Sequence, residues 1–123
     1  MLPGGGFGTV FLRDDKDECM PDRIQAITKM LASSPQDVFL HYSLAMELAS
    51  SGRFEEAVAE FRRCIELDAD YLAAYVEAGK SLRSAGKLED ARAIFNEALR
   101  LAAAQGQSHI RDHVQQQLDG LAN

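Results

Sequence analysis

From residue 22 onward, apolar residues recur at intervals of three and four, the spacing that places side chains on one face of an α-helix. The first such stretch covers residues 22–32 and stops before Pro35, because proline disfavours helical geometry at the residue that precedes it. Its apolar face consists of Ile24, Ile27, Met30 and Leu31. Asp37 is a suitable N-cap for a following helix. The same pattern predicts further helices at about residues 37–51, 54–68, 71–85 and 88–104.

Residues 38–71 and 72–105 repeat one another at a constant offset of 34. Gly52 and Gly86 match at this offset, and each supplies the positive φ that ends one helix and reverses the chain. Matches of size and polarity continue through Leu48 and Leu82, Phe54 and Leu88, Glu55 and Glu89, Ile65 and Leu99, and Leu67 and Leu101. A fixed period of this length predicts a solenoid of helical hairpins.

Within each repeat, small and large residues alternate in a fixed order. The small ones, at the eighth, twentieth and twenty-seventh positions, are Ala45, Ala57 and Cys64, then Gly79, Ala91 and Ala98. The large ones are Leu44, Leu48, Phe54 and Phe61, then Tyr75, Leu82, Leu88 and Phe95. In this pattern the two segments resemble consecutive tetratricopeptide repeats, although His41 replaces a large aromatic residue, and Ala69 and Ala103 replace the usual proline. The resemblance implies an all-α fold, a right-handed superhelical stack of antiparallel helix hairpins.

The flanking segments complete the predicted stack. Pro35 stands where a preceding repeat would end, so residues 22–34 look like the second helix of a repeat that lacks its first. After Gly106, a helix over about residues 107–121 has one apolar and one polar face, as a cap with one side in water requires. Its apolar face consists of Ile110, Val114, Leu118 and Leu121. We therefore expect one tetratricopeptide-repeat domain over residues 21–123.

Residues 1–20 differ from the rest, because they lack helical periodicity and their short β-favouring run has no second run to pair with. We expect them to form a flexible N-terminal tail. The stretch from Pro3 to Leu12 resembles the glycine-rich loop of a protein kinase, with Pro3 at the place of the first glycine. No kinase lysine motif, His-Arg-Asp or Asp-Phe-Gly follows, so the tail is the preferred interpretation.

Charge narrows the classes of partner. The net charge is −6 and the isoelectric point is about 5.0, and an acidic chain is repelled by phosphate backbones and anionic lipid. We therefore expect neither nucleic acid nor a membrane as a partner. The first residues lack the basic and apolar order of a secretory signal, and Cys19 and Cys64 form neither a disulfide framework nor a zinc pattern. A cytoplasmic location with reduced thiols is the expectation.

Candidate chemical groups are few. His109 and His113 stand four residues apart on the predicted cap helix, a spacing suited to a transition metal, but no third ligand is evident and solvated surface is the preferred interpretation. Cys64 occupies a small-residue position between helices and is expected to be a buried structural thiol. All acidic residues are predicted on outer faces, so no catalytic arrangement can be assembled. We expect no enzyme activity, no cofactor and no metal.

The resemblance marks the first helix of each hairpin as the binding surface. In the tetratricopeptide motif, the second, fifth, ninth and twelfth positions line a concave groove that receives ligands. Here they are Phe39, Tyr42, Met46 and Ala49, then Ala73, Val76, Lys80 and Arg83. Leu44 and Leu48 lie on a different stripe, so helix 37–51 is apolar on two sides. The basic and asparagine clamp for peptide C-termini is not matched, because Tyr42 and Met46 hold its first-repeat positions.

We therefore expect a protein–protein interaction module whose groove binds a peptide or helix of another protein. The expected contact residues are Phe39, Tyr42, Met46, Ala73, Val76, Lys80 and Arg83. Aromatic and methionine side chains suit an apolar anchor, and the two cations suit an acidic group beside it. Three alternatives remain. Helix 22–33 could cover Phe39 and Tyr42 as ordinary core, a homodimer could cover the same stripe, or the chain could be an accessory fragment of an enzyme such as a protein kinase.

Overall fold

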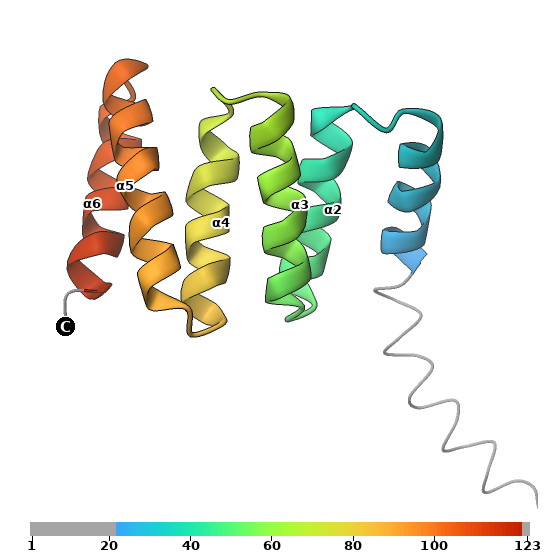
Figure 1. Ribbon diagram of the computed structural model, residues 1–123, viewed down its shortest axis with the longest axis horizontal. Helices are drawn as coiled ribbons and strands as arrows, with labels where there is room; N and C mark the ends of the chain where they lie inside the picture. Colours follow the sequence, from blue (N-terminus) through green and yellow to red (C-terminus); the bar gives the residue numbers. More distant parts are fainter. Residues whose placement is uncertain (1–21, 122–123) are drawn as a thin grey trace, which may run out of the picture.

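The computed structural model describes residues 22–121, and every regular element within that range is an α-helix (Figure 1). Residues 22–33 are helical. The later helices are α2 (Val38–Ser50), α3 (Phe54–Leu67), α4 (Leu72–Ser84), α5 (Leu88–Ala104) and α6 (Ser108–Leu121). The helices predicted between residues 37 and 104 are confirmed to within one residue at each end. The predicted tail, residues 1–20, lies outside the described residues together with its glycine-rich run and Cys19.

Successive helices pack against one another in chain order and form a right-handed stack of antiparallel hairpins (Figure 1). The first repeat forms the hairpin of α2 and α3, and the second forms the hairpin of α4 and α5. Helix 22–33 lies at one end of the row, beside the first hairpin, and α6 lies at the other end against α5. Each repeat therefore has the other repeat on one side and a single helix on its outer side.

The turn inside each hairpin has the same construction in both repeats. Gly52 and Gly86 adopt φ values of 81° and 82°, in the left-handed region that glycine occupies without a steric penalty. The following residue then donates its backbone N–H to a carbonyl in the last turn of the preceding helix. Arg53 reaches Leu48 O and Lys87 reaches Leu82 O, each at 2.9 Å. The predicted role of both glycines is confirmed, and the matched turns give the two hairpins matched geometry.

The core runs along the stack and is built from the repeated apolar positions. Ala57 and Ala91 are completely buried, and so are Phe61 and Phe95. The small residues let the two helices of each hairpin approach closely, and each phenyl ring fills the space one turn later. Burying a phenylalanine stabilises the fold by about 1.5–3 kcal/mol relative to leaving it exposed. The cores of the two hairpins therefore use the same arrangement of small and large residues, 34 residues apart in the sequence.

The two ends of the row differ in polarity. On α6, Val114 and Leu121 are buried while the opposite face is exposed, as predicted for a cap. That exposed face carries Arg111, Gln115, Gln116 and Asp119. At the other end, helix 22–33 packs three partly buried residues against the core but leaves Met30 53% exposed. Among residues 22–121, no helix combines the length and apolarity needed to cross a bilayer.

Candidate functional site

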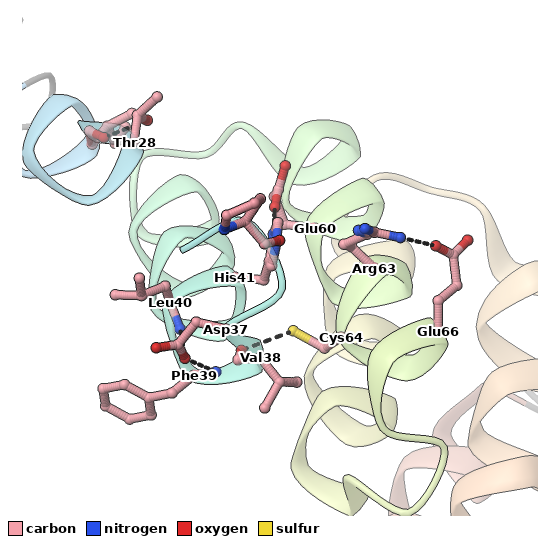
Figure 2. A network of polar contacts seen from close by, with 12 residues as sticks. Thr28, Asp37, Val38, Phe39, Leu40, His41, Glu60, Arg63, Cys64 and Glu66 are labelled. Carbon is pink, nitrogen blue, oxygen red and sulfur yellow. Dashed lines mark hydrogen bonds and ion pairs between the residues drawn. The ribbon is translucent and has the colours of Figure 1, made fainter. Parts of the chain in front are cut away.

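The first turn of α2 presents Phe39 to solvent. Asp37 caps this helix, because its Oδ1 accepts hydrogen bonds from the backbone N–H groups of Phe39 at 3.0 Å and Leu40 at 3.2 Å. The cap fixes the helix start and therefore the direction of the phenyl ring, which projects away from α3 (Figure 2). Phe39 is 64% exposed, so helix 22–33 does not bury it.

Tyr42, one turn further along α2, is held by aromatic neighbours. Its ring stacks on Tyr71 with centroids 5.2 Å apart and meets the edge of Phe61 at 5.7 Å. Burial, followed by the negative charge of Glu77, raises the pKa of Tyr42 to about 12. Met46 is likewise half-buried and packs against the core. Both side chains are thus partly core and partly surface, in contrast to Phe39.

The four expected groove residues of α4 differ in exposure. Ala73 is exposed, whereas Val76 is buried. Lys80 Nζ lies 3.3 Å from Glu77 Oε2, an ion pair within one turn of the helix. Arg83 donates a hydrogen bond to Gln117 Oε1 of α6. The two cations are therefore oriented by neighbouring side chains while they remain accessible to solvent.

A hollow of about 350 Å³ lies between α4 and α6. Its lining residues are Leu72, Ala73, Val76, Glu77, Lys80, His109, Ile110 and His113. The fold thus brings three of the seven expected groove residues, Ala73, Val76 and Lys80, into one concavity. Phe39, Tyr42, Met46 and Arg83 are not part of its lining. The site is a discontinuous surface with an aromatic end on α2 and a hollow at α4 and α6.

Three residues of α6 belong to this surface although the sequence pattern assigns them elsewhere. His109 and His113 are exposed, as predicted, but they also line the hollow. Ile110 is half-buried and contributes an apolar wall. The signal that identifies α6 as a groove helix is the 34-residue offset itself, since Ile110 follows Val76 by 34 residues. Extending the period into the cap helix would have located this part of the site.

His41, the residue that replaces a large aromatic, ties the start of α2 to two neighbours. Its Nδ1 lies 2.7 Å from Glu60 Oε1 on α3, and its Nε2 lies 2.8 Å from the carbonyl oxygen of Pro35 (Figure 2). The ring is mostly buried, with 12% of the side chain exposed. This histidine replaces apolar packing by two hydrogen bonds that hold the 34–37 turn against the first hairpin.

Three acidic residues, Glu47, Glu60 and Glu77, are half-buried and depart from the prediction that all acids lie on outer faces. Glu47 of α2 is half-buried, with 22% of its side chain exposed. Its Oε2 pairs with Arg23 at 3.4 Å, while its Oε1 is shielded from solvent and has no hydrogen-bond partner among the described residues. Helix 22–33 contributes to this environment, because it lies beside the first hairpin and its Arg23 reaches Glu47 on a face of α2 that the pattern of α2 alone marks as solvated.

The thiol of Cys64 is structural, as expected from its small-residue position. The residue is fully buried, and its Sγ lies 3.6 Å from Val38 O, to which it donates (Figure 2). Burial, followed by the charge of Glu60, raises the pKa of the Cys64 thiol to about 12, which disfavours the reactive thiolate. Between residues 22 and 121, no group of three or more His, Cys, Asp or Glu side chains is arranged to hold a metal ion.

Comparison with known sequences agrees with this architecture. A profile of the family described as "Tetratricopeptide repeat" matches residues 48–109. A TPR repeat-containing protein of Pseudomonas aeruginosa is 32% identical over 83 residues, which cover 68% of this chain and 79% of that protein. The matched residues of the profile begin in α2 and end at the start of α6, so they include the α4 wall of the hollow but only His109 of its α6 wall.

Solved structures share the fold over nearly the whole chain. PcrH, in complex with the chaperone binding region of PopD, superimposes with a TM-score of 0.78 at 18% identity, covering 99% of this chain and 97% of PcrH. The TPR2B domain of yeast Sti1, in its complex with pHsp70, gives a TM-score of 0.77 at 21% identity, covering 94% and 89% of the two chains. At these identities the likeness establishes the arrangement of helices.

Proposed function

The chain belongs to the tetratricopeptide repeat family, and on that premise we propose that it is a protein–protein interaction module. Its binding surface follows the groove side of α2, α4 and α6. The surface combines the expected residues Phe39, Tyr42, Met46, Ala73, Val76, Lys80 and Arg83 with His109, Ile110 and His113 of α6. The ligand is a peptide or a short helix of another protein, and the chain itself acts without catalysis or cofactor.

The observation that carries this proposal is the exposure of Phe39. A phenylalanine with 64% of its surface in solvent gains free energy when a partner covers it, and Asp37 has already fixed its position. Met30 at the same end of the stack is 53% exposed. A preorganised aromatic side chain at low conformational cost is typical of the residues that dominate protein interfaces.

The hollow between α4 and α6 supplies the second part of the ligand chemistry. Its walls are apolar at Val76 and Ile110. Lys80 lies in the wall in an ion pair with Glu77, and Arg83 lies one turn beyond on α4. A segment with an apolar anchor and an adjacent Asp or Glu fits this combination, because the cations orient the carboxylate while the apolar walls bury the anchor.

The remaining expectations from the sequence belong to this proposal as well. We place the protein in the cytoplasm and exclude nucleic acid as its ligand on the ground of its net charge of −6.

The alternative that a homodimer covers the α2 stripe predicts a different response. Substitution of Phe39 would then halve the measured mass instead of weakening the capture of another protein.

The test is affinity capture from the source cells with the wild type, Phe39→Ala and Lys80→Glu. Both substitutions should reduce the recovery of specific partners at least fivefold, while the melting temperature changes little because both side chains are accessible. Light scattering on the same proteins reports their mass, and so distinguishes a homodimer that covers the α2 stripe from a groove that binds another protein.

A matched control is Leu88→Ala, which removes an apolar side chain that is 45% exposed at the start of α5. Leu88 lies outside the lining of the α4–α6 hollow. Recovery that falls equally with Leu88→Ala would mean that general surface apolarity, and not the groove, holds the partner. Unchanged recovery with Phe39→Ala and with Lys80→Glu would refute the proposed surface.

A further inference from the structure

A second groove lies between α3 and α5, the two second helices of the hairpins. It has a volume of about 450 Å³. Its lining residues are Arg62, Ile65, Glu66, Tyr75, Asp90, Ala93, Ile94 and Glu97. Helix α4 contributes Tyr75 to this groove but Val76 and Lys80 to the α4–α6 hollow. The two concavities therefore lie on different sides of α4, and a ligand in one leaves the other free.

The groove has an apolar floor. Ile94 is buried and Ile65 is half-buried, so both offer carbon surface at the bottom without projecting into solvent. Ala93 is exposed, and its small side chain leaves the groove open on the α5 side. The hydroxyl of Tyr75 donates to Ala69 O at 2.7 Å, which fixes the ring in the wall. The groove therefore offers a rigid apolar binding site for a side chain of a partner.

The rim of the groove is acidic. Three carboxylates, Glu66, Asp90 and Glu97, face one guanidinium, Arg62. Asp90 has no ion-pair partner within the described part of the chain. Glu66 and Glu97 pair with arginines one turn along their own helices, but their side chains remain 65% and 54% exposed, and such exposed pairs contribute little and exchange readily.

Nearby charged groups also affect the pKa of Tyr75. Burial is the largest cause that raises its pKa, and the carboxylates of Glu97, Asp70 and Asp68 raise it further against the opposing charge of Arg100. Beyond burial, three carboxylates and one guanidinium therefore act on the Tyr75 hydroxyl, and of these Glu97 belongs to the rim of the groove.

We propose that the groove between α3 and α5 is a second interaction surface, and that it binds a basic segment of another protein. An apolar side chain of that segment packs on Ile65, Ala93 and Ile94, and flanking Lys or Arg side chains pair with Asp90, Glu97 and Glu66. Charge complementarity selects the occupant. A second copy of this chain is a poor occupant, because its net charge of −6 opposes self-association at an acidic site.

The consequence is a two-sided adaptor. The α4–α6 hollow favours an acidic ligand through Lys80, which pairs with Glu77, and through Arg83, which bonds to the neutral Gln117. The α3–α5 groove favours a basic ligand, so the two surfaces select ligands of opposite charge. Because α4 lies between them and supplies residues to both, one chain holds two different partners at the same time.

The experiment is an NMR titration of the 15N-labelled protein with two synthetic peptides of equal length. One is acetyl-Lys-Leu-Lys-Leu-Lys-amide and the other is acetyl-Glu-Leu-Glu-Leu-Glu-amide. The lysine peptide should shift the amide signals of residues 62–66, Tyr75 and residues 90–97. The glutamate peptide should leave these signals unchanged at the same concentration.

A pair of double variants gives the proposal a matched control. Asp90→Asn with Glu97→Gln removes two rim charges and should weaken the lysine peptide about fivefold. Glu55→Gln with Asp112→Asn changes the net charge equally at exposed positions outside the groove, and should leave the affinity within about a factor of two.

Ala93→Lys supplies the third variant. It places a tethered cation over the apolar floor, at an exposed position that tolerates substitution, and should abolish the shifts. Three results would overturn the proposal: no shifts at millimolar lysine peptide, shifts centred on α2, α4 and α6, or equal weakening by the two double variants.

Discussion

Helices α2 and α4 occupy equivalent places in the two repeats, but their surroundings give them different roles. Three residues of α2 are buried, Leu44, Ala45 and Leu48. Seven residues of α4 are buried, Leu72, Ala74, Val76, Ala78, Gly79, Ser81 and Leu82. The difference does not follow from apolar content, since α2 begins with the apolar run Val38-Phe39-Leu40. It follows from neighbours, because α4 packs between α3 and α5 and also faces α6.

This comparison indicates which repeat keeps apolar surface available for a partner. A repeat whose first helix is enclosed uses its apolar residues to bind its own neighbours, whereas a repeat whose first helix is less enclosed keeps part of its apolar surface free. Phe39 is 64% exposed, and its equivalent in the second repeat is Ala73. The repeat that is less enclosed thus carries the large anchor, and the enclosed repeat carries a small residue beside Lys80.

The strongest way to test the comparison is to overpack both hairpins at the same position. Ala57→Leu and Ala91→Leu each add three carbons at a fully buried site, where overpacking costs ~1–3 kcal/mol. We expect Ala91→Leu to lie at the upper end, because its partner helix α4 has seven buried residues. Ala57→Leu should cost less, since its partner helix α2 has only three buried residues and is enclosed less firmly.

The measurement is the free energy of unfolding from urea denaturation. Ala93→Leu, at an exposed position of the same helix as Ala91, is the control and should change it by less than ~0.5 kcal/mol. Equal costs for Ala57→Leu and Ala91→Leu would mean that enclosure by neighbours does not set the rigidity of a repeat. A stable Ala91→Leu variant would mean that the helices of the second hairpin do not touch there.

A smaller effect is expected where the two repeats differ by one methyl group. Ala45 of the first repeat corresponds to Gly79 of the second, and both positions are buried. A Cβ added at Gly79 would lie 2.6 Å from Cδ1 of Phe95, whose ring is fully enclosed and unable to move away freely. Gly79→Ala should destabilise the protein by about 1–2 kcal/mol, although alanine is the better helix former by ~1 kcal/mol.

The double variant Gly79→Ala with Phe95→Leu sharpens this test. Leucine is smaller than phenylalanine and leaves room for the new methyl group, so the two substitutions should cost less together than the sum of their separate costs. Additive costs in a thermal melt would show that the ring of Phe95 does not limit the approach of α4 and α5. The second repeat would then be no tighter than the first.

Much of the fold could be predicted from the sequence, because the 34-residue offset determines which residues of each hairpin meet. Gly52 and Gly86 indicate the positions of the turns. The sizes of Ala57 and Phe61 indicate where the two helices of a hairpin are in contact. The ion pair of half-buried Glu47 could not be predicted in this way, since it depends on helix 22–33 lying beside the first hairpin with Arg23 near α2. The hydrogen bonds of His41 likewise depend on the position of the preceding turn.

The site was less predictable than the fold for a related reason. The seven expected groove residues come from two helices, and periodicity locates each stripe on its own helix. Whether two stripes share a concavity depends on the next helix in the stack, and the sequence pattern predicts α6 only as a cap. The hollow that α4 forms with His109, Ile110 and His113 therefore appears only once α6 is placed beside α4.

The smallest expected effect concerns Cys64, whose equivalent in the second repeat is Ala98. Both are fully buried, but only Cys64 ionises, and burial raises the pKa of its thiol to about 12. In the unfolded chain the thiol has a pKa of about 8.5. Stability from this group is therefore fully present below about pH 8.5 and is lost as the pH rises from there toward 12, because only the unfolded state releases the proton.

Between pH 7 and pH 9 the wild type should lose about 0.8 kcal/mol more than Cys64→Ala. Parallel urea titrations of the two proteins at both pH values measure this difference, and every other titrating group cancels between them. Identical pH dependence would mean that solvent reaches the thiol in the folded protein, so that the first hairpin is less tightly packed than the second even at its innermost position.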